Sequence, residues 1–177
     1  APSIATEAGY TRLLEAPGII RAVVPFRDGF VAFKDNALFV GEYVGPNYLW
    51  KWRPLSHRIG CVGPNAVTEL DGRLYFVHTS GFYEFDGQTI RSIGLPVNQT
   101  FLTEAGLIQL GEFGHVPPTG ARGLAFTQAA ADDIEGVVWF NAPATFSSGG
   151  TKYSMQLFGY NSRSQKWGRF GNRSVAA

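Results

Sequence analysis

The side chains that could do chemistry are few and scattered along this sequence of 177 residues. No two of the histidines His57, His78 and His115 have the i, i+4 spacing of a zinc protease, and none shares a motif with a cysteine or a carboxylate cluster. His78 precedes Thr79-Ser80, which predicts a hydrogen-bonded turn histidine. Cys61 is the only cysteine and lies in an apolar stretch, which predicts a buried structural thiol and excludes an intrachain disulfide. There is no Gly-x-Ser-x-Gly elbow and no Gly-x-x-x-x-Gly-Lys loop. The sequence therefore predicts that the protein is not an enzyme and has no catalytic residue, cofactor or metal site.

The carboxylates also fit structural positions better than catalytic ones. A glycoside hydrolase needs two carboxyl groups facing one sugar. Asp28 and Asp71 each precede a glycine, and Asp-Gly between apolar runs is a strong hairpin signal. Asp132, Asp133 and Glu135 fall in a predicted turn, where clustered oxygens could also attract calcium. We expect all five side chains to serve turn geometry.

Basic residues gather near the end of the sequence. No acidic residue follows Glu135, so the remaining 42 residues carry +5, while the first 135 carry −4 (10 basic minus 14 acidic). Such a region can face nucleic acid or an acidic partner, or it can simply be a set of solvated turn residues. The residues that we assign, as a hypothesis, to DNA or an acidic partner are Arg163, Lys166, Arg169 and Arg173.

Four tryptophans stand in predicted strands. They could stack on sugars or bases, or fill the space between packed sheets. Their positions in strands favour packing. They are Trp50, Trp52, Trp139 and Trp167.

Composition indicates what kind of scaffold carries these residues. Hydrophobic residues make up 45% and charged residues 16%, with 14 Phe, 7 Tyr and 22 Gly. Aromatic residues with many glycines favour short strands and tight turns, so we predict an all-β fold. The low charge predicts a surface covered by neighbouring subunits. No apolar run reaches the roughly 20 residues of a membrane-spanning helix. The start lacks a signal pattern and an initiator Met, so we expect a processed product or a fragment of a longer protein.

An internal repeat organises the strands. The pairs Asp28-Gly29 and Asp71-Gly72 are 43 residues apart, and each lies between two short apolar runs. We predict a type I′ turn at both pairs. Two further strand candidates follow in each copy, giving the four strands of a β-propeller blade. A looser third copy is predicted to begin with a strand at Leu124–Thr127.

The predicted organisation is a partial β-propeller of about three four-stranded antiparallel units. These occupy residues 20–53, 66–94 and 122–171, with an insertion at 95–121 that holds a minor helix near 100–107. Residues 1–19 form an N-terminal extension or linker, and 172–177 a tail. Three blades do not close a ring. Either further blades lie outside these residues, or copies associate to complete it.

Over residues 20–171 the pattern resembles the propeller of bacteriophage tail and neck proteins, such as the packaged-DNA-stabilisation and tail-hub proteins of short-tailed phages. The residues that carry the resemblance are Phe26-Arg27-Asp28-Gly29, Trp50-Lys51-Trp52, Gly81-Phe82-Tyr83-Glu84-Phe85-Asp86-Gly87 and Val138-Trp139-Phe140. The resemblance implies a structural virion component without catalytic residues, assembled in the host cytoplasm and involved in DNA ejection. Its partners would be other tail, neck and connector proteins, further copies of itself, and packaged DNA.

Two other functions stay open at this point. A carbohydrate-binding, receptor-binding propeller would need exposed aromatics beside polar residues on one face. A glycoside hydrolase fragment would need two exposed carboxylates within about 10 Å of each other.

Overall fold

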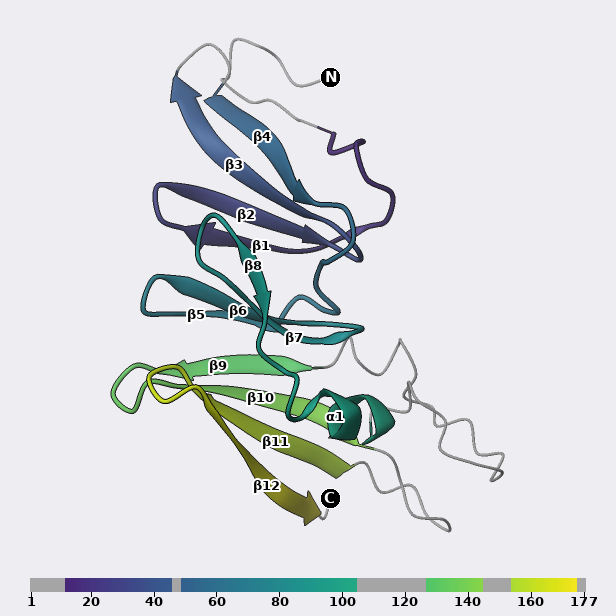
Figure 1. Cartoon of the computed structure of the whole chain (residues 1–177). Coiled ribbons are helices and arrows are strands. Elements are labelled where there is room, and N and C mark those ends of the chain that lie inside the picture. Colours follow the sequence, from purple (N-terminus) through teal and green to yellow (C-terminus); the bar gives the residue numbers. More distant parts are fainter. Residues whose placement is uncertain (1–11, 46–48, 105–126, 145–153, 175–177) are drawn as a thin grey trace.

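The computed structural model describes residues 12–45, 49–104, 127–144 and 154–174. These residues form three four-stranded antiparallel sheets and one short helix, so the prediction of an all-β fold is confirmed (Figure 1). In each sheet the strands lie side by side in chain order.

The first sheet contains β1 (Ile20–Phe26), β2 (Gly29–Lys34), β3 (Leu38–Gly45) and β4 (Leu49–Ser56). The second contains β5 (Val67–Leu70), β6 (Arg73–His78), β7 (Gly81–Phe85) and β8 (Ile90–Ser92). The third contains β9 (Gln128–Asp132), β10 (Val137–Ala144), β11 (Ser154–Asn161) and β12 (Lys166–Ser174). The helix α1 (Asn98–Glu104) follows the second sheet.

The third sheet begins later in the chain than predicted. Its first strand is Gln128–Asp132, and Thr127, the last residue of the predicted strand, is not in a strand. Residues 124–126 lie outside the described part. β9 is rich in alanine, a weak strand former by propensity, but Ala129 and Ala131 pack against the core. Burial therefore decides this strand where local propensity does not.

The helix begins two residues before its predicted start near residue 100, and residues 105–107 of the predicted helix lie outside the described part. It begins at Asn98, whose backbone N–H donates to Gly94 O at 2.7 Å. Phe101 is buried and lies 4.5 Å from Phe82, measured between ring centroids. The contact with the second sheet thus fixes where the helix lies. The rest of the predicted insertion, from residue 105 to 121, lies outside the described part.

The two Asp-Gly pairs occupy different positions in their hairpins. Asp71 and Gly72 are the two loop residues between β5 and β6, with φ of 52° and 71°, as a type I′ turn requires. In the first sheet the loop residues are instead Arg27 and Asp28, and Gly29 is already the first residue of β2. Of these two loop residues only Arg27 has positive φ, at 52°. The prediction of a type I′ turn at Asp28-Gly29 is therefore wrong.

Gly29 has a different role, in the close pairing of β2 with β3. A Cβ at position 29 would lie 2.2 Å from Gly41 O, a backbone atom of the neighbouring strand. The glycine is therefore needed for this close approach and not for a positive φ.

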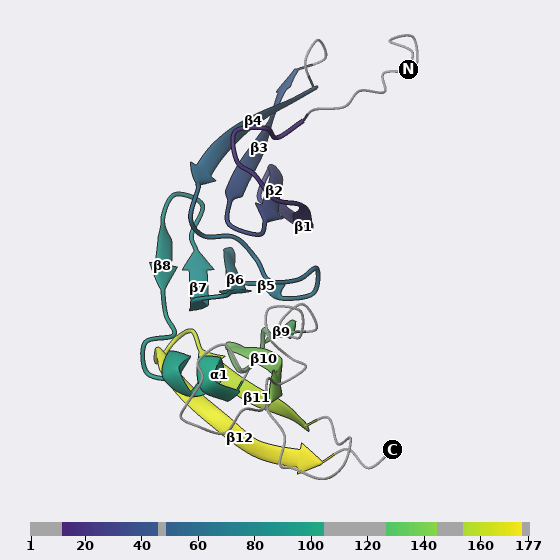
Figure 2. The same ribbon diagram turned by 90° about the vertical axis from the view of Figure 1, so that its right-hand side faces the viewer.

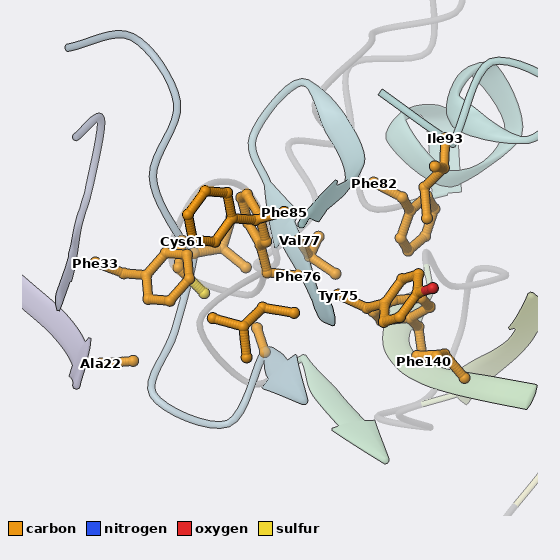
Figure 3. Packing of buried hydrophobic residues seen from close by; sticks show 14 of the residues in the cluster. Ala22, Phe33, Cys61, Tyr75, Phe76, Val77, Phe82, Phe85, Ile93 and Phe140 are labelled. Atoms are coloured by element: carbon orange, nitrogen blue, oxygen red, sulfur yellow. The ribbon is translucent and has the colours of Figure 1, made fainter. Parts of the chain in front are cut away.

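The sheets stack on one another and share one core. Figure 2 shows them following one another along an arc, with β1, β5 and β9 on its concave side and β4, β8 and β12 on its convex side. Phe33 of the first sheet meets Phe76 of the second at 4.9 Å, and Phe82 of the second meets Phe140 of the third at 4.8 Å (Figure 3). A single hydrophobic cluster therefore runs through all three sheets.

Because it lies between two others, the second sheet is buried on both faces. Tyr75, Phe76 and Val77 are consecutive in β6, and all three are buried. Consecutive buried residues in a strand require cover on both sides, since successive side chains point to opposite faces. The first and third sheets receive such cover from the second sheet on one side only.

Candidate assembly interface

The two histidines in the described part of the chain do not belong to a cluster of metal-binding or reactive side chains. His78 is buried, its Nδ1 accepts from the Ser80 hydroxyl at 2.8 Å, and its Nε2 donates to Asn36 Oδ1 at 3.1 Å. The prediction of a hydrogen-bonded turn histidine is confirmed. Burial lowers the pKa of His78, so its neutral form is favoured. His57 is exposed, and His115 lies outside the described residues.

Cys61 is a structural thiol, as predicted. It is fully buried in the core cluster, and its Sγ donates to Gly63 O at 3.2 Å. Burial raises the pKa of the thiol to about 11, so it stays protonated and unreactive.

The carboxylates singled out in the sequence lie in turns, except Asp132, which is the last residue of β9. Asp28 and Asp71 are exposed loop residues of the first two hairpins. Asp132 Oδ1 accepts from the backbone N–H groups of Ile134 and Glu135, both at 3.1 Å, which closes the turn after β9. In the described part of the chain, no three His, Cys, Asp or Glu side chains come together as metal ligands.

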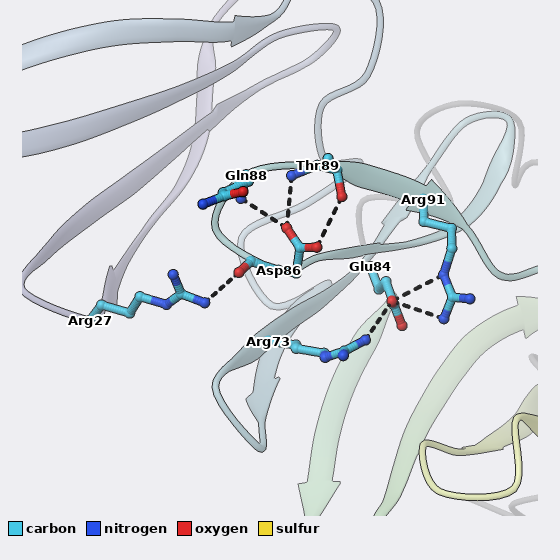
Figure 4. A network of polar contacts seen from close by, with 7 residues as sticks. All are labelled: Arg27, Arg73, Glu84, Asp86, Gln88, Thr89 and Arg91. Atoms are coloured by element: carbon cyan, nitrogen blue, oxygen red, sulfur yellow. Dashed lines mark hydrogen bonds and ion pairs between the residues drawn. The ribbon is translucent and has the colours of Figure 1, made fainter.

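Glu84 is the one buried carboxylate of the described residues, and arginines hold it on two sides. Its Oε1 lies 2.8 Å from Arg73 Nη1 and 2.9 Å from Arg91 Nη2 (Figure 4). Arg91 is its direct cross-strand neighbour in β8, while Arg73 comes from β6. The two ion pairs tie β7 to β6 and β8, which gives this carboxylate a structural role. Sequence reasoning missed this group because strand register, which brings its members together, was not known.

A groove of about 230 Å³ opens between the first and second sheets near their hairpin turns. Phe26 and Phe85 are among its lining residues, as are Arg27, Glu42 and Arg53. Three of the four charged residues that line the groove, Arg27, Glu42 and Arg53, have partners within the protein. Arg27 donates to Asp86 O, which joins the turns of the two sheets (Figure 4), and Glu42 lies 3.6 Å from Arg53. The groove is thus smaller than the 300–1,000 Å³ typical of ligand pockets and offers few unpaired polar groups.

The side of the first sheet that is turned away from the second carries aromatic residues. We call it the N-face. Strand register places Phe30 beside Gly41, and Gly41 beside Trp52. Trp50 lies 4.8 Å from Phe30 and 5.8 Å from Tyr43, measured between ring centroids. These five residues, with Val23, define the N-face.

The side of the third sheet that is turned away from the second also carries apolar residues. We call it the C-face, defined by Trp139, Leu157, Gly159 and Phe170. Trp139 is paired with Gly159, and its ring centroid lies 5.3 Å from that of Phe170. Leu157 is the cross-strand partner of Phe170.

The tryptophans therefore have two kinds of position. Trp167 lies between the second and third sheets, 4.8 Å from Phe82, and its Nε1 donates to Ile93 O at 2.8 Å. This one fills space between packed sheets, as we expected of all four. The other three, Trp50, Trp52 and Trp139, lie on the outward sides of the end sheets. Sequence reasoning could place them in strands but could not tell which side of a sheet would be covered.

The basic residues near the end of the sequence whose side chains the structure describes, Arg163, Lys166 and Arg169, do not form one surface. Arg163 stands in the turn after β11, and its Nη2 donates to Asp133 O at 3.4 Å. In β12, Lys166 pairs with Asn161, while Arg169 bonds to Gln156 on the core side at 2.8 Å. Alternation along the strand puts Lys166 and Arg169 on opposite sides. Arg173 is in β12, but its side chain lies outside the described part.

In the part of the chain that the structure describes, no helix has the length and apolar character needed to cross a membrane. A scan against models of known protein families finds no match, and a search of curated proteins finds no similar sequence.

Proposed function

We propose that this chain is a non-enzymatic structural module that acts by protein–protein contact, and that its three sheets are successive blades of a β-propeller. The observation that carries the proposal is the contrast between the sheets. The second sheet is buried on both sides, while the first and third turn aromatic faces outward. Large apolar patches on an outer surface mark interaction sites.

The arrangement of the sheets supports the propeller part of the proposal. Each sheet is a four-stranded meander, and the first strand of each lies on the concave side of the arc (Figure 2). Propeller blades are ordered in this way around a central axis. Three such sheets make an open arc, and the outer side of its first sheet is partly covered by Leu13 and Ala16.

We place this module in the tail or neck of a bacteriophage virion, as an adaptor between tail, neck and connector proteins. The motifs of the resemblance support this assignment, and they occupy structural positions. Trp50 and Trp52 are on the N-face, and Gly81–Phe85 forms β7 in the middle sheet. In this role the protein is assembled in the host cytoplasm, resides in the particle and takes part in DNA ejection.

The test is cross-linking mass spectrometry on particles purified from cells that carry the gene. Lys51 and Lys166 are both exposed, one on the first sheet and one on the third, so a lysine-reactive reagent reports on both ends of the stack. We expect cross-links from both lysines to virion proteins. Recovery of the chain only outside purified particles would contradict the phage assignment.

A carbohydrate-binding module is the second candidate, since Tyr43 and Trp50 form an accessible aromatic pair on the N-face. A glycan array with the wild-type chain and Trp50→Ala separates the two: binding that the substitution abolishes favours this alternative. The hydrolase alternative has less support. Of the carboxylates Asp28 and Glu42 that line the groove, the second is paired with Arg53.

A further inference from the structure

We propose that residues 12–19 form a strap over part of the outer side of the first sheet, and that Lys34 is the latch that holds this strap closed. The strap is the purple segment that leads into β1 in Figure 1. It opens and closes while the three sheets stay folded. This inference goes beyond the proposed function, because it concerns a movement within one chain.

Lys34 is a buried lysine whose ammonium group holds the backbone of the strap. It is the last residue of β2 and is only 6% exposed. Its Nζ donates to Leu13 O at 2.9 Å and to Ala16 O. The ion pairs of the described residues do not include Lys34. A buried charge needs hydrogen bonds to offset the loss of its water, so Lys34 and the strap stabilise each other.

Asp35, which follows Lys34, binds the other end of the strap. Its Oδ2 accepts from the backbone N–H of Ile19 at 3.1 Å, and its Oδ1 accepts from Arg21 Nε in β1. Gly18 permits this close approach, since it has φ of 96° and a Cβ there would lie 2.9 Å from Asp35 Oδ2. Two neighbouring residues at the end of β2 therefore fix the strap at both of its ends.

The second sheet uses the equivalent position in the same way. His78 is the last residue of β6, as Lys34 is of β2, and both side chains are buried. His78 Nε2 donates to Asn36 Oδ1 of the first sheet, so it fastens its own sheet to the part of the chain that precedes it. Lys34 fastens the first sheet to the strap. In both sheets this position joins the second strand to the element before it.

The first sheet also has room for the strap at a position that is filled in the second sheet. Two residues before the end of β6 stands Phe76, whose ring packs against the first sheet. Two residues before the end of β2 stands Ala32, in one buried cluster with Ala16 of the strap. Leu13 and Trp52 pack against this cluster. The small side chain of Ala32 thus leaves space for the strap.

Few other contacts hold the strap, so its opening should cost much less free energy than unfolding of the sheets. The strap has no regular secondary structure, and its exposed side chains include Leu14 at 78% and Ile19 at 60%. Ala16 is its only buried side chain. Segments with few buried contacts open locally. Opening removes the cover from Phe39 and from the adjacent side of Trp52.

A thiol at position 16 tests this inference, because the closed strap buries Ala16. In an Ala16→Cys chain the introduced thiol can react with a labelling reagent when the strap opens. Cys61 is fully buried in the core shared by the sheets, so it reacts when the sheets open and is an internal reference. Peptide mass spectrometry measures both labelling rates in one sample. These rates follow the open populations when opening and closing are fast.

We expect the introduced thiol to react about a hundredfold faster than Cys61, or more. Adding Lys34→Met should raise its rate about tenfold or more, because two carbonyl groups of the strap lose a charged donor. Lys51→Met, at an exposed lysine of the same sheet, is the matched control and should not change the rate. Phe82→Ala weakens the contact between the second and third sheets, so it should accelerate the labelling of Cys61 only.

Gly18→Ala is a second variant that keeps every charge and therefore replaces Lys34→Met if that variant does not fold. The added Cβ lies too close to Asp35, and the left-handed φ disfavours a side chain, so the introduced thiol should react about tenfold faster. Gly168→Ala is its control, at an exposed glycine where a Cβ would meet only Phe170 Cε2 at 4.0 Å. Circular dichroism checks that each variant is folded.

Three results would overturn the inference. Equal labelling rates for the introduced thiol and Cys61 would mean that the strap opens only when the sheets open. An introduced thiol that reacts as fast as a free cysteine would mean that the strap is not closed. A rate that neither Lys34→Met nor Gly18→Ala changes would mean that Lys34 and Asp35 do not hold the strap.

Discussion

His78 joins two sheets through hydrogen bonds, and its side chain can make all of them only in the neutral form. Its Nδ1 accepts from the Ser80 hydroxyl and backbone N–H, and its Nε2 donates to Asn36 of the first sheet. Protonation would remove the acceptor at Nδ1 and place a charge in a buried site. Burial accordingly lowers the pKa of His78 in the folded protein. Folding and protonation of this residue are therefore linked.

The sign of the linkage follows from the direction of the shift. Below the ordinary pKa of 6.5 the unfolded chain binds a proton that the folded one does not, so stability is lost as pH falls from 6.5 toward the lowered pKa. We expect His78→Gln to flatten this part of the profile, with His57→Gln, an exposed position, as control. The difference in slope should approach but not exceed about 1.4 kcal/mol per pH unit. Urea unfolding between pH 7.5 and 5 measures it; parallel profiles for the wild type and His78→Gln would show that the histidine is not linked to folding.

Elements in this protein depend on glycines for two different reasons. Gly72 provides a backbone conformation, with φ of 71° and nothing within 4 Å of an added Cβ. Gly29 provides space, because its Cβ would stand 2.2 Å from the backbone oxygen of Gly41. The first role concerns one turn, and the second concerns the pairing of β2 with β3.

These roles predict different losses on substitution by alanine. Gly72→Ala should cost about 1–2 kcal/mol, the strain of a left-handed residue with a side chain. Gly29→Ala should cost about 3 kcal/mol or more, because two backbones must separate and the strand pair is disturbed. Chemical denaturation of both variants, compared with the wild type, tests the order. Equal losses would mean that β2 and β3 can shift without cost.

Much of the element pattern could be predicted, and the failures have a common cause. A hairpin turn such as Asp71-Gly72 depends on local sequence, so its residues predict it. The apolar residues around Cys61 likewise predict that this thiol is buried. The start of β9, the ion pairs of Glu84 and the separation of Lys166 from Arg169 depend on register or on contacts between sheets. The periodicity of the sequence does not predict these contacts. The candidate interface was missed for the same reason, since only the stack shows which sheet faces lack a neighbour.

At the scale of the whole molecule the three sheets share one core, and Phe82 is at its centre. Its ring lies within 4.5–5.7 Å of the rings of four aromatic residues from α1 and the third sheet, which are Phe101, Phe140, Phe158 and Trp167. A residue that couples the second sheet to the third should control the stability of both. The sheets are expected to unfold together.

We expect Phe82→Ala to destabilise the fold by about 3–5 kcal/mol, the usual cost of removing a buried phenylalanine. Leu95→Ala, at an 81% exposed site, should change stability by less than about 0.5 kcal/mol. Two single-tryptophan variants are needed, one that retains Trp52 and one that retains Trp167. Their fluorescence reports the unfolding of the first and the third sheet, respectively. The two reporters should share one midpoint without the Phe82 change, and should share a second, lower midpoint with it. Two separate midpoints would show that the end sheets are independent.

The chain-order arrangement of strands has a consequence for biosynthesis. Every strand within a sheet pairs only with its immediate predecessor or successor in the chain, and such local strand pairing speeds folding. Each meander can form as it leaves the ribosome. In the second sheet, however, Phe82 stays uncovered until β10, β11 and β12 have been synthesised. During that interval the nascent chain exposes the apolar surface around Phe82. A chaperone would bind the chain at this stage.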